Sequence, residues 1–457
     1  MYPPIKIAAI LVGILHFGEN MERKYLKYKN YAHFDKRMSI KKAEKLFLDD
    51  ETINKHGFFP FINFKIKSRK FENNEKNKRT EPKTRDIYYA AHLDRYIYQK
   101  YANEIGVRYN EYVKINNIDG CSVAYRSGLG KCNIDFAKEA FEAIKTGDKN
   151  IIIIGDFTNF FDNLDHKHLK SRLKTVLKKE LDNNLYKVFK SITKFNYISV
   201  DEIYVYLTKK EGKRSEKFFM RTLKQIMTNE EFKEFVKMPN VLQKNKKDYG
   251  IVQGSSLSGL LANIYMILFD KKMNELAKLY NGKYMRYSDD FILIMDGKSD
   301  GHISKVYEQI QMAVLEAGKI QLKPEKTNVF KYDKHNIECI NEKILYTNNV
   351  PNIINFLGFS FDGIDIKIRN KTITKYNYKM IKNIKHYKNG KNISLKQIYN
   401  KFTFQGLNKK RGNFISYVKR AEKIFKNENS IEKVRKKSKE KVSTNLSKMN
   451  KEQIKIN

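Results

Sequence analysis

The segment KYMRYSDDFILIMDG, residues 283–297, sets two apolar runs on either side of a short polar turn. Such a pattern is typical of a β-hairpin, and its turn carries the adjacent carboxylates of Asp289 and Asp290. A second strand signal lies earlier in the chain, where NIIIIGD at residues 150–156 ends at Asp156. Its consecutive isoleucines predict a strand that lies buried within a sheet. We therefore expect a sheet with acidic residues at the ends of its strands.

An antiparallel sheet that contains both segments places the carboxylates of Asp156, Asp289 and Asp290 side by side. Negative charge at this density requires metal ions, and two divalent ions about 3.5–4 Å apart are the arrangement that serves in-line phosphoryl transfer. Hard oxygen ligands favour Mg2+. An isolated Asp-Asp pair is also ordinary turn chemistry, so the hairpin by itself leaves both interpretations open.

The composition of the whole chain points to a nucleic-acid partner. The 457 residues are enough for about three packed domains, and 41% of them are hydrophobic, which excludes small peptides and fully disordered chains. Lysine and arginine number 90 against 51 aspartates and glutamates, a formal net charge of +39 that predicts a polyanionic partner. Biased codon usage toward Lys, Asn and Ile is an alternative source of part of this excess.

The cysteines and the N-terminal segment bear on the location of the protein. Three cysteines without C-x2-C spacing exclude a disulfide framework and a zinc module, so we expect a cytoplasmic protein. The apolar run at residues 7–17 is too short to span a membrane and lacks the basic start and the cleavage site of a secretory signal. We expect no membrane contact. Met21 is an alternative natural start, which would make residues 1–20 a dispensable leader.

Several motifs, in the same order along the chain, resemble those of the reverse transcriptases. YSDD at residues 287–290 matches their Y-x-D-D box, and DFTNFF at residues 156–161 matches their first metal motif, with an aromatic residue five positions after the aspartate. QGSSLS at residues 253–258 falls where the family has its Q-G-x-x-x-S segment. The resemblance runs from about residue 83 to residue 359.

The resemblance implies an α+β fold, a right-hand polymerase with fingers, an antiparallel-sheet palm and a helical thumb. Within the palm, residues 320–330 are predicted as an edge strand, and the tail has too few apolar residues to pack well. The expected domains are a leader at residues 1–20, an N-terminal extension and fingers at 21–149, a palm at 150–363 with a helical insertion at about 166–248, a basic helical thumb at 364–426 and a polar basic tail at 427–457.

The family also implies roles for the acidic site. Asp156 and Asp289 would bind two Mg2+ ions, which Mn2+ could replace. Asp290 would support them, and the main-chain carbonyl of Phe157 would complete the set. Lys326, in the PEKTNVF segment, would either protonate the departing pyrophosphate or only neutralise it.

A further set of residues is implied to contact the incoming deoxynucleotide. The basic residues would hold its triphosphate, arginine as a bidentate fork and lysine as a point charge. Phe161 would stand under the sugar and exclude a 2′-hydroxyl, although Phe160 and Phe161 could equally be core residues. Glycine in the Q-G segment would let the backbone approach the base pair. The set consists of Lys83, Arg85, Phe161, Gln253, Gly254 and Tyr287.

Another set is implied to contact primer and template. FLGF at residues 356–359 resembles the hairpin that grips the primer end, and VAYRSG at residues 123–128 resembles a fingers segment. GLGK at residues 128–131 lacks the spacing of a phosphate-binding loop, which we reject. Lysines and tyrosines interleave at residues 371–391, as in a surface that binds nucleic acid, with a solvated helix face as the alternative. The set consists of Tyr125, Arg126, Ser255, Ser256, Phe356, Leu357 and Gly358.

Departures from the family pattern indicate a narrower group. Ser255 stands where many relatives have proline, and Ser288 replaces the commoner Ala or Val of the Y-x-D-D box. Together with YAHFDKR at residues 31–37, SVAYR and NIDFAK within residues 122–138, and NFISYVKRAEKIF at residues 413–425, these features resemble the bacterial defence-associated reverse transcriptases of the unassigned groups. The resemblance implies RNA-directed DNA synthesis from dNTPs in anti-phage defence, on a structured noncoding RNA, with a second protein or a homo-oligomer as a further partner.

Other functions remain open at this point. They are a template-independent or protein-primed DNA polymerase of the abortive-infection type, a retron-like or maturase-like RNA-binding reverse transcriptase, an RNA-dependent RNA polymerase, and a scaffold without catalysis. The bulk of Phe161 argues against incorporation of ribonucleotides, and the presence of all three aspartates argues against a scaffold.

Overall fold

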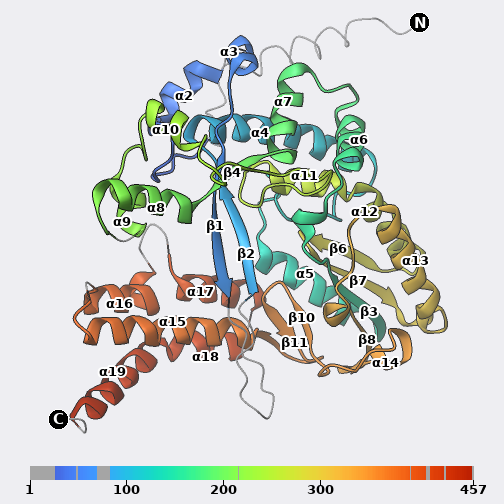
Figure 1. The fold of residues 1–457 in the computed structure, drawn as a ribbon. Coiled ribbons are helices and arrows are strands. Elements are labelled where there is room, and N and C mark those ends of the chain that lie inside the picture. Colours follow the sequence, from blue (N-terminus) through green and yellow to red (C-terminus); the bar gives the residue numbers. More distant parts are fainter. Residues whose placement is uncertain are drawn as a thin grey trace, which may run out of the picture. The chain divides into compact units, whose positions relative to one another are not determined.

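The computed structural model of this chain contains two compact units. One unit comprises Met1–Asn116 and Asn159–Ile267, and the other comprises Asn117–Thr158 and Leu268–Asn457. Figure 1 shows their helices and strands. The predicted leader at residues 1–20 lies outside the described residues. The structure describes residues 26–47, 50–68, 83–214, 216–391, 393–407, 412–426 and 429–454.

The first unit contains a sheet with the strand order β2-β1-β4-β5. β1 and β2 form a long antiparallel ribbon, and β1 pairs with β4 in parallel (Figure 1). β2 therefore lies at the edge of this sheet. The strands are β1 (Phe61–Ser68), β2 (Lys83–Tyr89), β4 (Asn196–Ser199) and β5 (Gln243–Lys244).

Helices make up most of the rest of the first unit. Asp165 caps the start of α6, since its side chain accepts a hydrogen bond from the backbone N–H of His168. Ile62 of β1 and Phe219 of α9 belong to one buried core. The helices are α2 (Ile40–Phe47), α3 (Asp50–Lys55), α4 (His92–Ile115), α6 (His166–Leu177), α7 (Asn183–Thr193), α8 (Val200–Glu211), α9 (Glu216–Thr222), α10 (Asn229–Phe235) and α11 (Ser258–Tyr265), with a 3-10 helix η1 (Phe160–Asn163).

The second unit contains a five-stranded antiparallel sheet with the order β6-β7-β3-β8-β9. β3 is the central strand, and its residues Ile151, Ile152 and Ile153 are at most 2% exposed. The prediction of a buried strand is therefore confirmed. The strands are β3 (Lys149–Asp156), β6 (Lys283–Tyr287), β7 (Asp290–Asp296), β8 (Asn328–Asp333) and β9 (Asn336–Cys339).

The edge strand predicted for residues 320–330 is wrong in both its extent and its place. β8 begins only at Asn328, because Pro324–Lys326 forms a 3-10 helix, η3. β8 is also an inner strand, since β9 pairs with its outer side, where Phe330 lies opposite Cys339. β9, the short strand that directly follows β8 and provides this partner, was not predicted.

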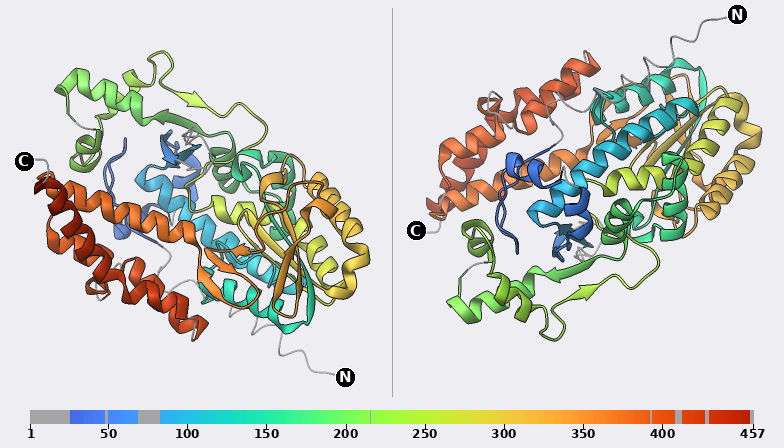
Figure 2. Two further views of the ribbon diagram at one scale, coloured as in Figure 1. Left: turned by 90° about the horizontal axis from the view of Figure 1, so that it is seen from below. Right: turned by 90° about the horizontal axis from the view of Figure 1, so that it is seen from above.

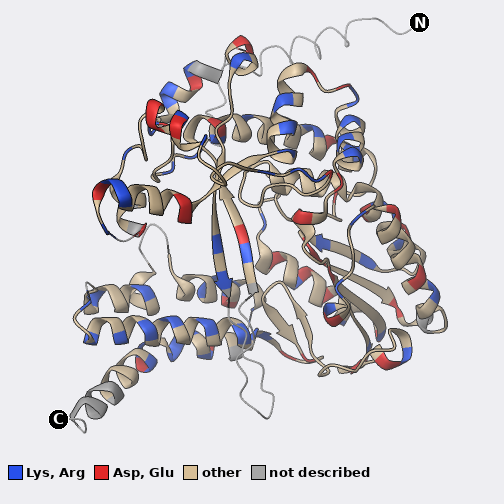
Figure 3. Cartoon of the chain, in the orientation of Figure 1, with Lys and Arg blue, Asp and Glu red and all other residues tan. Residues whose placement is uncertain are grey.

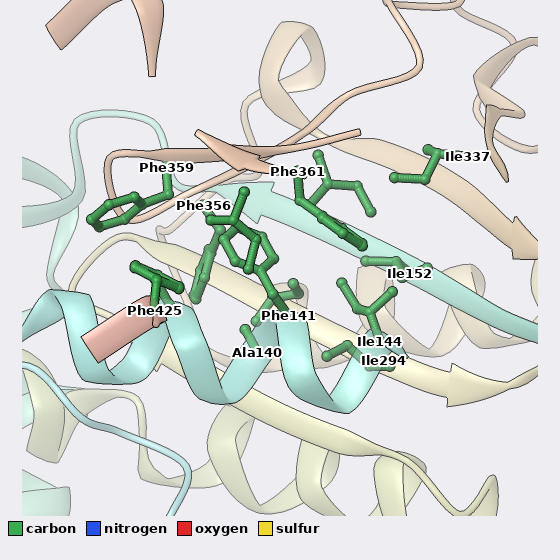
Figure 4. Packing of buried hydrophobic residues seen from close by; sticks show 14 of the residues in the cluster. Ala140, Phe141, Ile144, Ile152, Ile294, Ile337, Phe356, Phe359, Phe361 and Phe425 are labelled. Atoms are coloured by element: carbon green, nitrogen blue, oxygen red, sulfur yellow. The ribbon is translucent and has the colours of Figure 1, made fainter. Parts of the chain in front are cut away.

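One helix and a small second sheet cover the main sheet of this unit (Figure 4). Phe141 and Ile144 of α5 lie against Ile152 of β3, and the ring of Phe141 lies 5.4 Å from that of Phe361 in β11. The elements are α5 (Asn133–Thr146), α12 (Ile267–Leu279), α13 (Ile303–Glu316), α14 (Asn341–Ile344), β10 (Ile354–Phe356), β11 (Phe359–Phe361) and β12 (Ile366–Ile368), with a 3-10 helix η2 (Gly297–His302).

The C-terminal part of the second unit is a set of helices that lie side by side in both views of Figure 2. Met380, Ile398 and Val442 belong to their shared core. Ile431 and Val442 are fully buried, so the expectation of a poorly packed tail is wrong for these residues. The helices are α15 (Asn370–Lys388), α16 (Leu395–Phe402), α17 (Phe414–Phe425), α18 (Asn429–Lys436) and α19 (Ser438–Ile454), with a 3-10 helix η4 (Phe404–Gly406).

The predicted α+β class with an antiparallel palm sheet is confirmed. All three cysteines are free thiols, in agreement with the absence of a disulfide framework. Within the part of the chain that the structure describes, no helix has the length and apolar character needed to cross a bilayer.

Candidate active site

Two antiparallel strands bring the predicted carboxylates to one end of the main sheet. In the register of β3 and β7, Asp156 lies opposite Asp290 and Gly155 lies opposite Phe291. Glycine is required there, because a Cβ at Gly155 would lie 2.3 Å from a ring carbon of Phe291. The other strand of the predicted hairpin is β6, in which Tyr287 pairs with Asp290.

Ser288 and Asp289 form the turn between β6 and β7. Ser288 has a φ of +64°, a left-handed conformation that is unfavourable for a residue with a side chain. Neighbouring groups hold the turn: the hydroxyls of Tyr125 and Ser288 lie 3.1 Å apart, and Nη1 of Arg286 donates to the carbonyl of Ser288 at 2.9 Å. The backbone N–H of Phe157 donates to the carbonyl of Asp289 at 3.1 Å.

The crowding of these carboxylates changes their acidity. Burial, the charge of Asp289 and a hydrogen bond with Asp156 together raise the pKa of Asp290 to about 7. A hydrogen bond between two carboxyl groups requires one of them to carry the proton. With a pKa of about 7, Asp290 is about half protonated at neutral pH, and a bound cation would displace this proton.

Lys326 lies at the same end of the sheet. Its Nζ donates to Oδ2 of Asp156, and its side chain is 47% exposed, whereas that of Asp156 is 8% exposed. The backbone N–H of Lys323 donates to the carbonyl of Asp156 at 2.8 Å, which fixes this segment against the end of β3. Lys326 therefore places a positive charge beside the carboxylates and still reaches solvent.

The donor atoms fit a hard divalent cation. Asp156, Asp289 and Asp290 offer carboxylate oxygens, the ligands that such a cation prefers, and burial together with the neighbouring carboxylates raises the pKa of Asp290. The chemistry of these donors fits the cation, but their spacing does not yet form a complete site: among the residues that the structure describes, no three His, Cys, Asp or Glu side chains lie closely enough to hold a metal ion together.

A pocket of about 300 Å³ adjoins the carboxylates within the second unit. The tight turn between β10 and β11 forms one wall, in which Leu357 and Gly358 have φ values of +48° and +94°. Asn133 supports this turn by donating to the carbonyl of Leu357 at 3.0 Å. The lining residues are Asn133, Ile154, Tyr287, Asp290, Asn355, Phe356, Leu357, Gly358 and Arg369.

The structure corrects the prediction that Arg126 contacts primer or template. Its side chain is only 1% exposed, and it forms an ion pair of 2.5 Å with Asp119 and a hydrogen bond of 3.1 Å with the carbonyl of Ser122. These contacts hold the loop that carries Tyr125. Tyr125 itself is 53% exposed, has a φ of +57°, and remains next to the turn at Ser288.

The predicted triphosphate-binding residues lie in the first unit, on the edge strand β2. The side chain of Arg85 is exposed, and that of Lys83 lies outside the described residues. Arg85 pairs across the ribbon with Ile66, which is 48% exposed. In the structure Arg85 therefore lies on an exposed strand, where a charged ligand can reach it.

Gln253 and Gly254 also belong to the first unit, where they lie against β2. The carbonyl of Gln253 accepts a hydrogen bond of 2.9 Å from the backbone N–H of Tyr88. Gly254 has a φ of +130°, and a Cβ there would lie 2.2 Å from the carbonyl oxygen of Tyr88. The close approach that requires this glycine is therefore to the protein's own strand. Ser255 accepts from the N–H of Leu257 at 3.3 Å.

Phe160 and Phe161 differ in burial. Phe160 is 4% exposed and belongs to the core, whereas Phe161 is only partly buried. Their ring centroids lie 5.5 Å apart at an angle of 67°. The spacing had selected Phe161 as the ring that faces the nucleotide, and its partial exposure leaves it available for that contact.

The sequence profile of one protein family, described as reverse transcriptase (RNA-dependent DNA polymerase), matches residues 95–361, more than half of the chain. This chain belongs to the reverse transcriptase family. The resemblance noted for the Y-x-D-D box and the first metal motif is therefore confirmed at the level of the family, and the right-hand polymerase class follows from this membership.

Solved structures similar to this reverse transcriptase chain include telomerases. One from Candida albicans, in complex with the TWJ fragment of telomeric RNA, is 14% identical with a TM-score of 0.43, over 92% of this chain and 59% of that one. An apo telomerase from Candida tropicalis, truncated from its C-terminal domain, is 15% identical with a TM-score of 0.38. This match covers 67% of this chain and 57% of the telomerase chain. This chain thus spans less than two thirds of these telomerase chains. No curated protein matches the sequence.

The structure adds residues to this candidate site that the motifs did not reveal. Asn133 and Arg369 line the pocket, but the sequence motifs assigned neither of them a role in the site. Arg286 and Asp270 form a buried ion pair next to the turn at Ser288 and Asp289. The sequence did contain one signal, because Arg286 lies in the strand KYMRY of the predicted hairpin. An arginine that such a strand buries needs a partner of opposite charge.

Proposed function

We propose that this chain is an RNA-directed DNA polymerase, a nucleotidyltransferase that extends a primer with deoxynucleotides. The observation that carries the proposal is the register of β3 and β7, in which Asp156 lies opposite Asp290 beside the turn of Asp289. Membership of the reverse transcriptase family supports the same reaction.

In this proposal Asp156 and Asp289 hold two Mg2+ ions, with Asp290 and the carbonyl of Phe157 in support, and Mn2+ is able to replace Mg2+. When bound, the ions favour attack by the primer hydroxyl and stabilise the leaving oxygen of an in-line displacement. The protein contributes ligands whose backbone is already fixed: Asp156 by the sheet and Asp289 by its turn. Such preorganisation lowers the reorganisation needed during the reaction.

Lys326 acts on the leaving group in this proposal. Its contact with Asp156 holds it at the site, and its 47% exposure lets the ammonium reach a substrate phosphate. The ammonium neutralises the developing charge on pyrophosphate or donates a proton to it.

The residues proposed to contact the nucleotide are Lys83, Arg85, Phe161, Gln253, Gly254 and Tyr287. Lys83 and Arg85 hold the triphosphate, and the ring of Phe161 excludes a 2′-hydroxyl. The partial burial of Phe161 against Phe160 supports this role, because a ring that is packed on one side cannot move away from the sugar. Gln253 and Gly254 contact the nucleotide and the template in this proposal. Primer and template are contacted by Tyr125, Ser255, Ser256, Phe356, Leu357 and Gly358.

Helix α15 supports binding of a nucleic-acid duplex or a structured RNA. The helix contains no Asp or Glu, and Tyr376, Met380 and Ile384 on one side of it are buried. Figure 3 shows basic residues along it. Tyr378, on the exposed side, is 60% exposed and can stack on an unpaired base. The exposed lysines are Lys371, Lys375, Lys379, Lys382 and Lys385.

We further propose that the template is a structured noncoding RNA and that the product DNA serves bacterial anti-phage defence. The sequence features at Ser255 and Ser288 support this narrower assignment. Sequencing the RNA and the newly made DNA that copurify with the protein tests it: a single enriched RNA with complementary DNA is expected, and DNA without a complementary RNA would indicate template-independent synthesis instead.

The central test is primer extension with purified protein, Mg2+, dTTP and an oligo(dT) primer on poly(rA). We expect Asp289→Ala to reduce extension at least about a thousandfold, because the site loses a ligand that no neighbour replaces. Asp333→Asn is the matched control. This carboxylate lies at the opposite end of the same sheet, where it pairs with Lys149 at the surface, and full activity is expected. Equal activity of Asp289→Ala and the wild type would refute the metal assignment.

The choice of sugar separates this function from an RNA-dependent RNA polymerase. We expect the wild type to prefer dTTP over UTP and Phe161→Ala to lower this preference by about 1–3 kcal/mol, or about 10- to 200-fold, as for other sites that exclude a small group by shape. The measurement is the ratio of kcat/KM for the two nucleotides. An unchanged ratio would remove Phe161 from the selection of the sugar.

A further inference from the structure

A buried ion pair lies directly behind the proposed catalytic turn, within the second unit. The side chains of Arg286 and Asp270 are 0% and 1% exposed. Nε of Arg286 lies 2.8 Å from Oδ1 of Asp270, and Nη2 lies 2.7 Å from Oδ2, which is the bidentate geometry of a strong pair. Tyr284 donates its hydroxyl to Oδ1 of Asp270 at 2.8 Å. Helix α12 and strand β6 are thereby joined.

The arginine also acts on the turn itself. Nη1 of Arg286 donates to the carbonyl of Ser288 at 2.9 Å, and that carbonyl belongs to the peptide group joining Ser288 to Asp289. The next peptide group, joining Asp289 to Asp290, is held by the backbone N–H of Phe157 at 3.1 Å. The two peptide groups that flank Asp289 are therefore both fixed, and with them the direction of its side chain.

The main chain of Arg286 anchors a second neighbour of the turn. Its N–H donates to the carbonyl of Cys121 at 2.7 Å, and its carbonyl accepts from Val123 at 3.0 Å. The loop that begins there carries Tyr125, whose hydroxyl reaches Ser288. One residue thus connects α12, β6, this loop and the turn.

Stability alone does not explain this arrangement. A buried ion pair is often no more stable than well-packed apolar residues of similar size, because both charges lose their hydration. Only arginine has a planar fork with donors left over for a third acceptor, and lysine does not reproduce it. The feature that needs an arginine here is the simultaneous contact with Asp270 and the carbonyl of Ser288.

We infer that Arg286 is a positioning residue that orients Asp289 and that Asp270 holds Arg286 in the required orientation. The inference rests on the proposed polymerase function. Arg286 is fully buried and acts through the turn, so its loss should slow the chemical step and weaken Mg2+ binding without changing the affinity for nucleotide.

The first variant is Arg286→Lys, which keeps a positive charge beside Asp270 but cannot also reach Ser288. We expect kcat to fall about 10- to 100-fold, the size of effect that a displacement of about 1 Å produces at a catalytic group, with a nearly constant KM for dTTP. Calorimetry without nucleotide should show weaker Mg2+ binding than in the wild type.

The decisive variant is Arg286→Met combined with Asp270→Leu. Two apolar side chains leave no unpaired buried charge, so the protein should fold with only a modest loss of melting temperature from the Tyr284 hydroxyl, which loses its acceptor, whereas kcat should remain as low as in Arg286→Lys. Wild-type kcat in this double variant would overturn the inference, because the pair would then be only structural.

Tyr284→Phe is the matched control. It removes a hydrogen bond to Asp270 but leaves the contact between Arg286 and Ser288, and kcat within about twofold of the wild type is expected. If the arginine variants do not fold, Asp270→Asn is compared with the wild type at a temperature where both are fully folded. A lower kcat with weaker Mg2+ binding supports the inference, and unchanged values of both overturn it. An inactive wild type would instead refute the proposed function.

Discussion

A buried ion pair in the second unit and a buried histidine in the first unit show two ways of accommodating polar side chains. In the second unit Arg286 and Asp270 are buried as a pair of charges. In the first unit His33 is fully buried, and burial together with the nearby His92 lowers its pKa to about 3, so it stays neutral. Pairing keeps the charges and fixes their geometry, whereas neutralisation avoids the charge altogether. The second unit is therefore sensitive to loss of a partner, and the first is sensitive to acid.

The largest expected effect comes from removing one partner of the buried pair. Asp270→Ala leaves the guanidinium of Arg286 buried without its counter-charge, and we expect the second unit to lose about 3–5 kcal/mol of stability. Urea unfolding followed by circular dichroism measures this loss. A loss below about 1 kcal/mol would mean that the charge of Arg286 is compensated or reaches solvent when Asp270 is absent.

Acid should produce a smaller effect, and in the first unit. The folded pKa of His33, about 3, lies below its ordinary value of 6.5, so only the unfolded chain takes up the proton as the pH falls from 6.5 toward 3. This uptake favours unfolding, and we expect His33 to remove about 2 kcal/mol of stability by pH 5.

His33→Asn isolates this contribution from that of the other histidines. Asparagine can accept the hydrogen bond that Nδ1 of His33 takes from the N–H of Phe34, at 2.8 Å, and it does not titrate. The difference in unfolding free energy between pH 7 and pH 5 should be about 2 kcal/mol smaller in the variant than in the wild type. Equal differences would show that His33 is protonated in the folded protein.

The smallest effect is expected at an exposed ion pair. Lys149 and Asp333 lie 3.2 Å apart with side chains 66% and 51% exposed. Lys149→Gln should cost at most about 1 kcal/mol, and less at high salt, because water and ions screen the pair. A larger loss would show that burial does not explain the difference in stabilisation between this pair and the pair of Arg286 and Asp270.

The sequence alone determined the parts of this protein that depend on local pattern. Alternating and continuous apolar runs predicted β3 and the β6–β7 hairpin, and the order of the motifs predicted the family. The same local signals placed Asp156, Asp289 and Asp290 at strand ends, since a strand and its turn are set by neighbouring residues.

Only the tertiary structure decided which side chains meet. The sequence offered Arg126 as a contact for nucleic acid, yet its pairing with Asp119 buries it. It explained Gly254 by the approach of a base pair, whereas the carbonyl of Tyr88 already occupies the space of a Cβ. The partnership of Arg286 with Asp270 was equally invisible. Such contacts join segments that are brought together only by the packing of the whole unit. The pattern of residues within one segment does not show which other segment it will contact.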